Sequence, residues 1–261
     1  MKIAIISDIH GNLPALQAVL ADIDQLGVDL IINCGDTLAG PLEAARTADL
    51  LMARGIPMVA GNHERQMLTL PPDNMGPSDT CALAELSLHQ RDWLATAPPT
   101  LQLTKDVFVC HGTPSSDLQG WLHTVTDDFG VDASPGIRPA STTEVLARLG
   151  ESSIGHASLL LCGHTHLPSV VNVACTTTGR QVTIVNPGSV GLQAYDEAWP
   201  HRHHVENGSP HARYAIAIPA ASSWQIELRQ VMYDFESMAR LATSRQRPDW
   251  AVALRTGRMV A

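Results

Sequence analysis

Short apolar runs alternate with amphipathic stretches along the chain. The runs at 2–7, 30–33, 56–60, 107–110 and 159–162 have the length and composition of buried strands. After Asn12, a suitable N-cap, apolar residues from Leu16 to Ile23 recur at helical spacing until Gly27, and a second amphipathic segment covers 42–54. These β-α-β units predict parallel strand pairing with right-handed crossovers.

The middle of the chain has weaker patterns. A breaker cluster at 71–77 precedes a helical pattern over 79–95, which we expect to lie beside the functional site. Residues 101–103 and 107–110 resemble a hairpin. Residues 112–140 are rich in Gly, Pro, Ser and Asp, and we expect an insert loop there with a functional role.

The second half of the chain shifts to antiparallel signals. The expected strands are 159–162, 169–174, 181–185, 212–218 and 224–230, with turn residues between them. We expect these strands to form a second sheet that packs face to face with the first, with helices outside both. The fold class is therefore α/β.

Composition sets the size and the partners. A chain of 261 residues with 44% hydrophobic content can form one large domain, and we expect a single domain over 1–261. The formal charge of -9 gives no basic footprint, so stable binding of long nucleic acid is not expected, whereas small phosphate esters remain possible substrates.

The cysteines and the apolar runs bear on the compartment. The five cysteines show no metal-binding spacing and are expected to be reduced core residues. The first apolar run is too short for a signal peptide, and no apolar stretch has the length of a membrane span. We therefore expect a soluble cytoplasmic protein without membrane contact.

Five polar runs follow the predicted strands directly. Because the carboxyl ends of parallel strands meet at one edge of a sheet, the five runs are expected to lie side by side. Gly35, Gly61 and Gly163 each precede a candidate ligand residue. A glycine there would let the backbone turn sharply or come close to a bound anion. The runs are Asp8-x-His10, Gly35-Asp36, Gly61-Asn62-His63-Glu64, His111-Gly112 and Gly163-His164-Thr165-His166.

The residue types in these runs suit a divalent transition metal. Carboxylate, amide and imidazole ligands favour Mn, Fe or Zn over a thiolate-bound structural zinc. One such run alone would be weak evidence, but all five in order exceed what one ion needs. Two ions that share one bridging carboxylate explain the set, and such pairs catalyse phosphoryl displacement.

The motif set resembles that of the calcineurin-like metallophosphoesterase superfamily, and residues 186–191 resemble its compact bacterial phosphodiesterase branch. The resemblance covers about residues 1–192. It implies a four-layer α-β-β-α sandwich of two mixed sheets, and it is compatible with a homodimer. It also implies two divalent metal ions per chain, for which Mn is expected and Fe, Zn, Ni or Co are alternatives.

The resemblance also implies a role for each matching residue. Asp8, His10 and His166 would hold the first ion, and Asn62, His111 and His164 the second, with Asp36 bridging both. His63 would then be catalytic: it would lie over the substrate phosphate while a metal-bridging hydroxide attacks.

The expected function is a metal-dependent phosphodiesterase that hydrolyses small phosphate esters. One alternative is a phosphomonoesterase, either a protein phosphatase or a nucleoside-polyphosphate hydrolase, and another is a non-catalytic interaction scaffold. Protein phosphatases of the superfamily carry a second Asp and an Arg after the Gly-Asp pair, and residues 35–40 lack both. Every metal-ligand position matches the motifs, which disfavours a scaffold.

Two later segments lie outside the matching motifs. The histidine-rich segment 197–211 is interpreted as an insert loop with surface histidines, with a third metal site or a phosphate clamp as the alternative. His201 and Arg202 are candidates for contacting a second ester group of the substrate. The arginine-containing segment from about 234 is expected to be a C-terminal tail or a solvated helix face.

Overall fold

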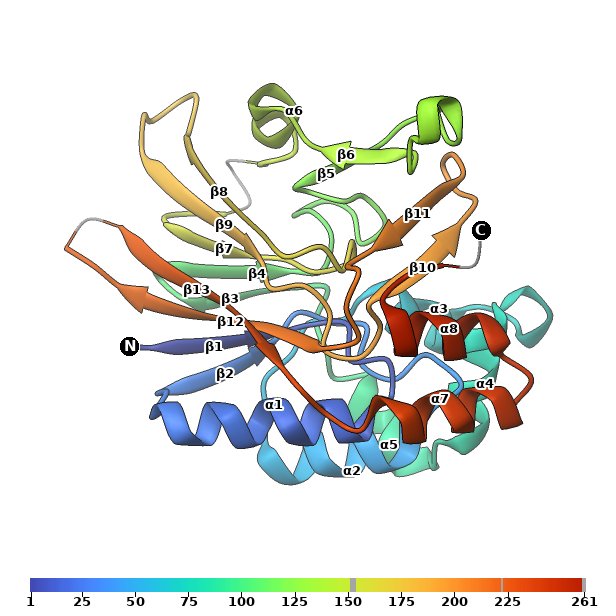
Figure 1. The fold of residues 1–261 in the computed structure, drawn as a ribbon. Helices are drawn as coiled ribbons and strands as arrows, with labels where there is room; N and C mark the ends of the chain where they lie inside the picture. Colours follow the sequence, from blue (N-terminus) through green and yellow to red (C-terminus); the bar gives the residue numbers. More distant parts are fainter. Residues whose placement is uncertain (151–153, 222, 260–261) are drawn as a thin grey trace.

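In the computed structural model, residues 1–150, 154–221 and 223–259 are described, and they form two packed β-sheets with helices outside them (Figure 1). The first sheet has the order β13-β12-β1-β2, with β1 and β2 parallel and the other pairs antiparallel. Its strands are β1 (Ile3–Ile6), β2 (Leu30–Asn33), β12 (Ala212–Pro219) and β13 (Trp224–Val231).

The second sheet has the order β3-β4-β7-β9-β8. Its central pairs β4–β7 and β7–β9 are parallel, while the edge pairs are antiparallel, so both sheets are mixed as predicted. The strands are β3 (Thr100–Thr104), β4 (Val107–Cys110), β7 (Leu159–Leu161), β8 (Ser169–Ala174) and β9 (Gln181–Asn186).

The assignment of strands to sheets corrects the sequence interpretation. Residues of β12 and β13 were expected in the second sheet but belong to the first, where Ala4 of β1 pairs with Ile216 of β12. The reason is that β1 is fully buried and β2 occupies only one of its edges, so the other edge needs a partner strand. The apolar, mostly buried β12 fills this position.

Alternate residues of β1 face two different cores. Ile3 and Ile5 pack between the sheets against Val109 and Leu161, whereas Ala4 and Ile6 pack with the buried face of helix α1 (Leu13–Leu26). A strand covered on both faces reads as a continuous apolar run, which is the pattern in the sequence. The sandwich therefore follows directly from this run.

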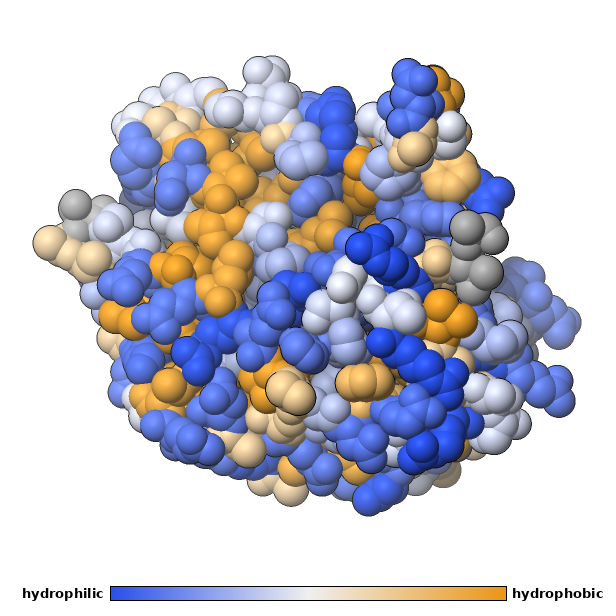
Figure 2. Space-filling model, in the orientation of Figure 1, coloured by the Kyte–Doolittle hydropathy of each residue, from blue (hydrophilic) through white to orange (hydrophobic). Residues whose placement is uncertain are grey.

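Helices cover the outer faces and complete the predicted four-layer sandwich. The helices α1, α2 (Ala44–Arg54) and α7 (Phe235–Ser244) lie on the side of the first sheet, and α6 (Thr142–Ala147) lies over the second (Figure 1). In Figure 2, hydrophilic side chains cover much of the helical layer. Apolar side chains gather where the edge strands β8 and β13 approach each other, and Val170 and Ile226 of these strands pack on the same inner core.

Two predicted elements differ in the structure. Residues 56–60 do not form a strand: a single bridge joins Met58 to Asn33, because Pro57 has no N–H to donate and Ala60 donates to Pro98 instead. The helix expected over 79–95 is two helices, α4 (Pro77–Glu85) and α5 (Leu88–Leu94). Ser87 separates them, since its side chain caps α5.

The expected loops and the expected tail also contain regular structure. The insert at 112–140 holds a hairpin of β5 (His123–Val125) and β6 (Ile137–Pro139) and the short helix η2 (Val131–Ala133). Segment 197–211 takes part in a second hairpin, β10 (Ala194–Glu197) and β11 (His203–Glu206). Beyond residue 234, α7 and α8 (Pro248–Thr256) form a packed pair, and their Ala239 and Leu254 are fully buried.

Two short helices complete the elements near the sheet edge, namely α3 (Asn62–Thr69) and η1 (Pro72–Asn74). Among the described residues, none of the helices combines the length and the apolar character that a membrane crossing requires.

Candidate metal centre

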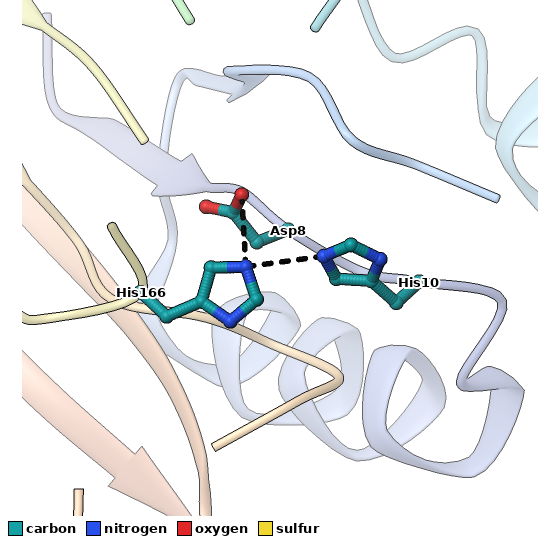
Figure 3. A group of neighbouring side chains, drawn as sticks. All are labelled: Asp8, His10 and His166. Carbon is teal, nitrogen blue, oxygen red and sulfur yellow. Dashed lines mark hydrogen bonds and ion pairs between the residues drawn. The ribbon is translucent and has the colours of Figure 1, made fainter. Parts of the chain in front are cut away.

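The predicted ligands converge beyond the carboxyl ends of β1, β2, β4 and β7. The structure brings six of them into two groups, and within each group the ligand atoms lie within 4.8 Å of one another. The groups are Asp8, His10 and His166, and Asp36, His111 and His164. Figure 3 shows the first group, in which the three side chains point toward one another from two loops that are far apart in the sequence.

The backbone at these positions is unusual. Asp8, His10, Asp36, His164 and His166 all have positive φ, between 52° and 69°, a region that residues with a Cβ rarely occupy. Hydrogen bonds between the loops hold this conformation, for example from the N–H of Asp8 to the carbonyl of Gly35. Strained backbone that the surroundings enforce is typical of functional sites.

Two of the preceding glycines allow close approach of neighbouring loops, as predicted. A Cβ on Gly61 would lie 2.2 Å from Oδ1 of Asp36, and a Cβ on Gly163 would lie 1.9 Å from Oγ of Ser7. Neither distance is possible between non-bonded atoms. A larger residue at either position would therefore displace the ligand-bearing loops.

The histidine rings of the first group have the protonation that a metal ligand needs. Nδ1 of His10 donates to the carbonyl of Ala39 at 2.8 Å, and Nδ1 of His166 donates to that of Leu192 at 2.7 Å. In neutral rings both Nε2 atoms are then unprotonated, and they face each other at 3.1 Å. Two facing lone pairs repel unless a cation or a proton lies between them, so this group fits a metal ion.

The second group follows the same rule. Nδ1 of His111 donates to the carbonyl of Cys34 at 2.8 Å, which leaves Nε2 facing Oδ2 of Asp36 at 3.0 Å. Nε2 of His164 donates to the carbonyl of Leu118 at 3.0 Å, so its Nδ1 faces Oδ1 of Asn62 at 3.1 Å. All seven predicted ligands thus lie in the two groups or beside them.

Electrostatics favour the ionised carboxylate of Asp36 and the neutral ring of His10. Burial raises the pKa of Asp36, but the charges that His111 and His63 can carry outweigh it and hold the pKa well below its ordinary value. Burial and the nearby His166 lower the pKa of His10 to about 3. Electrostatics act differently on His111: burial lowers its pKa, but Asp36 outweighs burial and raises the pKa to about 10, so a bound cation would have to displace a proton from this ring. Among the described residues, Oδ2 of Asp8 is buried without a hydrogen-bond partner, as expected of an atom whose partner is a cation.

Glu64 supports the site from behind, a role that sequence reasoning did not assign. Its buried carboxylate accepts from the N–H groups of Gly61, Asp36 and Thr37 at 2.8 to 2.9 Å. This one side chain therefore ties the loop after β2 to the start of α3. The available signal was its position as the third residue of α3, from which a glutamate can accept from the N–H of the N-cap residue, here Gly61.

His63 has a different kind of partner from the other histidines. Its Nδ1 bonds to Oδ1 of Asp79 at 2.6 Å, and its side chain remains one quarter exposed. Burial lowers its pKa, but Asp36 and Asp79 outweigh burial and raise the pKa to about 9. Asp79 was not identified from the sequence, because only its place at the start of a helical segment was visible there.

An open cleft of about 1250 Å³ lies over these residues. Its walls come from the loop before α4, the 116–125 segment, the β10–β11 hairpin and α8. The hairpin contributes Trp199 and His203 to the lining. By contrast, Arg202 pairs with Asp196 at 3.6 Å and lies over Phe129. Neither Arg202 nor His201, the two candidates for contacting a second ester group, is among the residues that line the cleft.

The last helix, α8, takes part in the cleft, so the C-terminal segment is not a tail. Trp250 lines the cleft from α8 and Arg247 from the N-cap position before it. The ring of Trp250 packs edge-on against the predicted ligand His10 with a centroid distance of 5.9 Å. Gly40 makes room for this ring, since a Cβ there would lie 2.5 Å from the indole.

The expectation that one sheet carries all the ligand runs is wrong, because the runs follow β1 and β2 of the first sheet and β4 and β7 of the second. A two-sheet α/β sandwich with paired carboxylate and imidazole groups beyond the strand ends of both sheets defines a class of proteins built around a divalent-metal site. More specifically, the chain belongs to the calcineurin-like phosphoesterase superfamily, whose domain model matches residues 1–203. This membership places it among the phosphoester hydrolases and confirms the family predicted from the motifs.

Individual relatives agree with this assignment at the level of the fold. The crystal structure of a metallophosphoesterase from Sphaerobacter thermophilus matches with a TM-score of 0.69 and 22% identity, over 98% of this chain and 99% of that one. A putative diadenosine tetraphosphatase matches with a TM-score of 0.50 and 14% identity, over 88% of this chain and 94% of that one.

One curated relative matches over a short region. The uncharacterized protein MJ0912 of Methanocaldococcus jannaschii is 39% identical over 66 residues, which are 25% of this chain. The match spans about a quarter of that relative's length, 27%.

Proposed function

We propose that the protein is a phosphodiesterase that uses two divalent metal ions to hydrolyse small phosphate esters. Asp8, His10 and His166 would hold one ion, and Asn62, His111 and His164 the other, with Asp36 shared. The observation that carries this proposal is the pair of adjacent ligand groups in which each ring directs one nitrogen to a backbone carbonyl and turns the other toward the centre of its group.

The chain's own residues divide the chemistry between them. When bound, two divalent ions supply positive charge at the phosphate and lower the pKa of water toward neutrality. His63 lines the cleft beside Asp36 and, held by Asp79, would carry a proton to the leaving-group oxygen. The buried carboxylate of Glu64 keeps the loop of Asp36 in place during the reaction.

Two observations support a diester over a monoester. Protein phosphatases of the superfamily carry a second Asp and an Arg after the Gly-Asp pair, and residues 35–40 of this chain lack both. The cleft, at about 1250 Å³, is larger than the usual pocket for one small ligand, so it has room for groups on both sides of a phosphate. Mn is the proposed metal, because imidazole ligands favour transition metals over Mg.

The direct test compares rates on mono-, di- and triesters of p-nitrophenol with added Mn. We expect the diester to give the highest kcat/KM, and we expect His63→Ala to lose about 100-fold or more in kcat while it keeps both metals. Elemental analysis of the variant checks the metals. Faster turnover of the monoester would replace the diester proposal, and absence of turnover with full metal content would favour a scaffold.

A further inference from the structure

The 116–123 segment lies against the turn that carries His164 and His166. The carbonyl of Leu118 accepts from Nε2 of His164 at 3.0 Å. This bond selects the ring tautomer, because a carbonyl can only accept, and it therefore leaves Nδ1 free to face Asn62. The other ligand histidines use carbonyls next to the sheet edge, whereas His164 depends on the insert.

The segment fits the turn closely at two further points. A Cβ on Gly120 would lie 2.6 Å from Cγ2 of Thr165, the residue between the two ligands. The ring of His123 bonds to Oγ1 of the same threonine at 3.2 Å. The position of the Leu118 carbonyl is therefore coupled to the ligand-bearing turn over several residues.

Arg148, the residue after α6, holds this segment from the other side. Its Nη1 donates to the carbonyls of Gly120, Trp121 and His123, each at 3.1 Å, and its Nη2 donates to Oγ1 of Thr124 at 2.7 Å. Its side chain is only 12% exposed. A guanidinium presents several donors in one plane, so a lysine could not make the same set of bonds.

We propose that Arg148 is a positioning residue for the second metal ion. It holds the carbonyls of residues 120–123, this segment fixes the Leu118 carbonyl, and the Leu118 carbonyl orients the ring of His164. This inference rests on the proposed metal centre. It assigns to the insert at 112–140 a function that its sequence left open. Partners that orient a ligand histidine in this way typically contribute 10- to 100-fold to metal affinity.

A purely structural role for Arg148 makes a different prediction. If Arg148 only stabilised the insert, its loss would lower the free energy of unfolding and leave both metal affinities unchanged. The proposed role requires a selective effect on one ion. Metal binding, measured without any substrate, therefore separates the two.

The test titrates Mn into the chelator-treated full-length protein by calorimetry, with metal content measured in parallel. For Arg148→Met we expect about 10- to 100-fold weaker binding of one of two ions, with the other bound within about 3-fold of wild type. Arg138→Met is the matched control, because Arg138 shares the partner Glu144 but is half exposed and contacts none of the 120–123 carbonyls. It should bind both ions as wild type does.

Gly120→Ala provides a second test that leaves Arg148 intact. The added methyl would push the segment away from Thr165, so it too should weaken one ion selectively. This variant decides the question if Arg148→Met does not fold. Wild-type affinity for both ions in Gly120→Ala and in a folded Arg148→Met would overturn the inference.

The outcome is separable from that of the proposed function. Selective loss of one ion in a protein that hydrolyses no ester would support the positioning role and contradict the phosphodiesterase. Hydrolysis of diesters with unchanged metal binding in both variants would support the phosphodiesterase and contradict the positioning role.

Discussion

His63 differs from the other histidines of the cleft floor in the chemistry of its partner. Four rings donate to backbone carbonyls, which fixes one nitrogen as a donor and directs the other toward the proposed metal positions. His63 instead pairs with the carboxylate of Asp79, which stabilises the protonated ring. The hydrogen-bond partner thus distinguishes the proposed proton donor from the proposed metal ligands.

The pairing predicts how activity depends on pH. The pKa of His63 is raised to about 9, so the proton is present at neutral pH and is lost as the pH rises through that value. The stability that the raised pKa contributes is complete below the ordinary value of 6.5 and is lost as the pH rises from there to about 9. Bound cations would offset the charge of Asp36, which leaves Asp79 to hold the proton. Asp79→Asn should therefore move the alkaline limb of kcat to lower pH.

A pH profile of kcat on a p-nitrophenyl diester measures this shift, with product quantified after quenching at one pH. Asp24→Asn, in an exposed pair with Arg54, is the control and should keep the wild-type profile. An unchanged alkaline limb in Asp79→Asn would show that His63 is not the group that titrates.

Asp36 is the residue on which both metal groups depend. Its carboxylate faces His111 at 3.0 Å and also interacts with His10 of the other group. Asp36→Asn removes a negative charge between two cations, so we expect fewer than two ions per chain and a loss of at least about 100-fold in kcat/KM. Elemental analysis measures the ion content. Asp29→Asn is the control, because Asp29 lies just before β2 whereas Asp36 follows that strand. Two tightly held ions in Asp36→Asn would refute the bridging assignment.

At the scale of elements, the N-caps of two helices differ in how far their contacts extend. Asn12 caps α1 by accepting from the N–H of Ala15, and its buried amide also donates to the carbonyl of Gly191 and to the hydroxyl of Tyr233. Asp234 caps α7 from an exposed position through Ser237. The first cap therefore joins three segments, and the second stabilises only its own helix.

Substitution of the two caps should separate these roles. Asp234→Ala should lower the free energy of unfolding by about 1 kcal/mol, the usual contribution of a cap. Asn12→Ala should lower it by about 2 to 3 kcal/mol, because it also leaves two buried groups without their partner. Denaturant unfolding at fixed Mn concentration measures both, and equal effects would mean that the bonds to Gly191 and Tyr233 contribute little.

Elements whose apolar residues recur at a regular spacing were predictable from the sequence, whereas elements whose position depends on distant partners were not. The helix from Leu13 to Leu26 and the strand β2 match their patterns, because apolar spacing and caps are local signals. The place of β12 beside β1 follows from an unpaired edge that only the assembled sheet has. The motifs predicted the six residues that converge in the two groups, but Asp79, Glu64 and Trp250 reach the site through tertiary packing.

At the scale of the whole molecule, the cleft is assembled from most of the chain's length. The ligands come from loops between residues 8 and 166, while the walls include the β10–β11 hairpin and α8, which lies beyond the matched family domain. The walls, and not the proposed metal positions, would contact the ester groups, so we expect them to determine the choice of substrate. Substitutions in α8 or the hairpin should therefore alter KM among esters more than they alter metal content.

Metal binding should also stabilise the whole fold, because the ligands join loops from both sheets. Any ligand that binds only the folded state at 100 times its Kd adds about 2.7 kcal/mol, which for a chain of this size corresponds to roughly 5 to 10 °C in Tm. Calorimetric scans of the chelator-treated protein should therefore show Tm rising with Mn concentration, and rising less with Mg, since imidazole ligands discriminate against it. Asp36→Asn should show a much smaller shift, whereas His63→Ala should respond as wild type does. An equal response of Asp36→Asn would place the stabilising metal outside the cleft and would remove the link between this fold and its proposed chemistry.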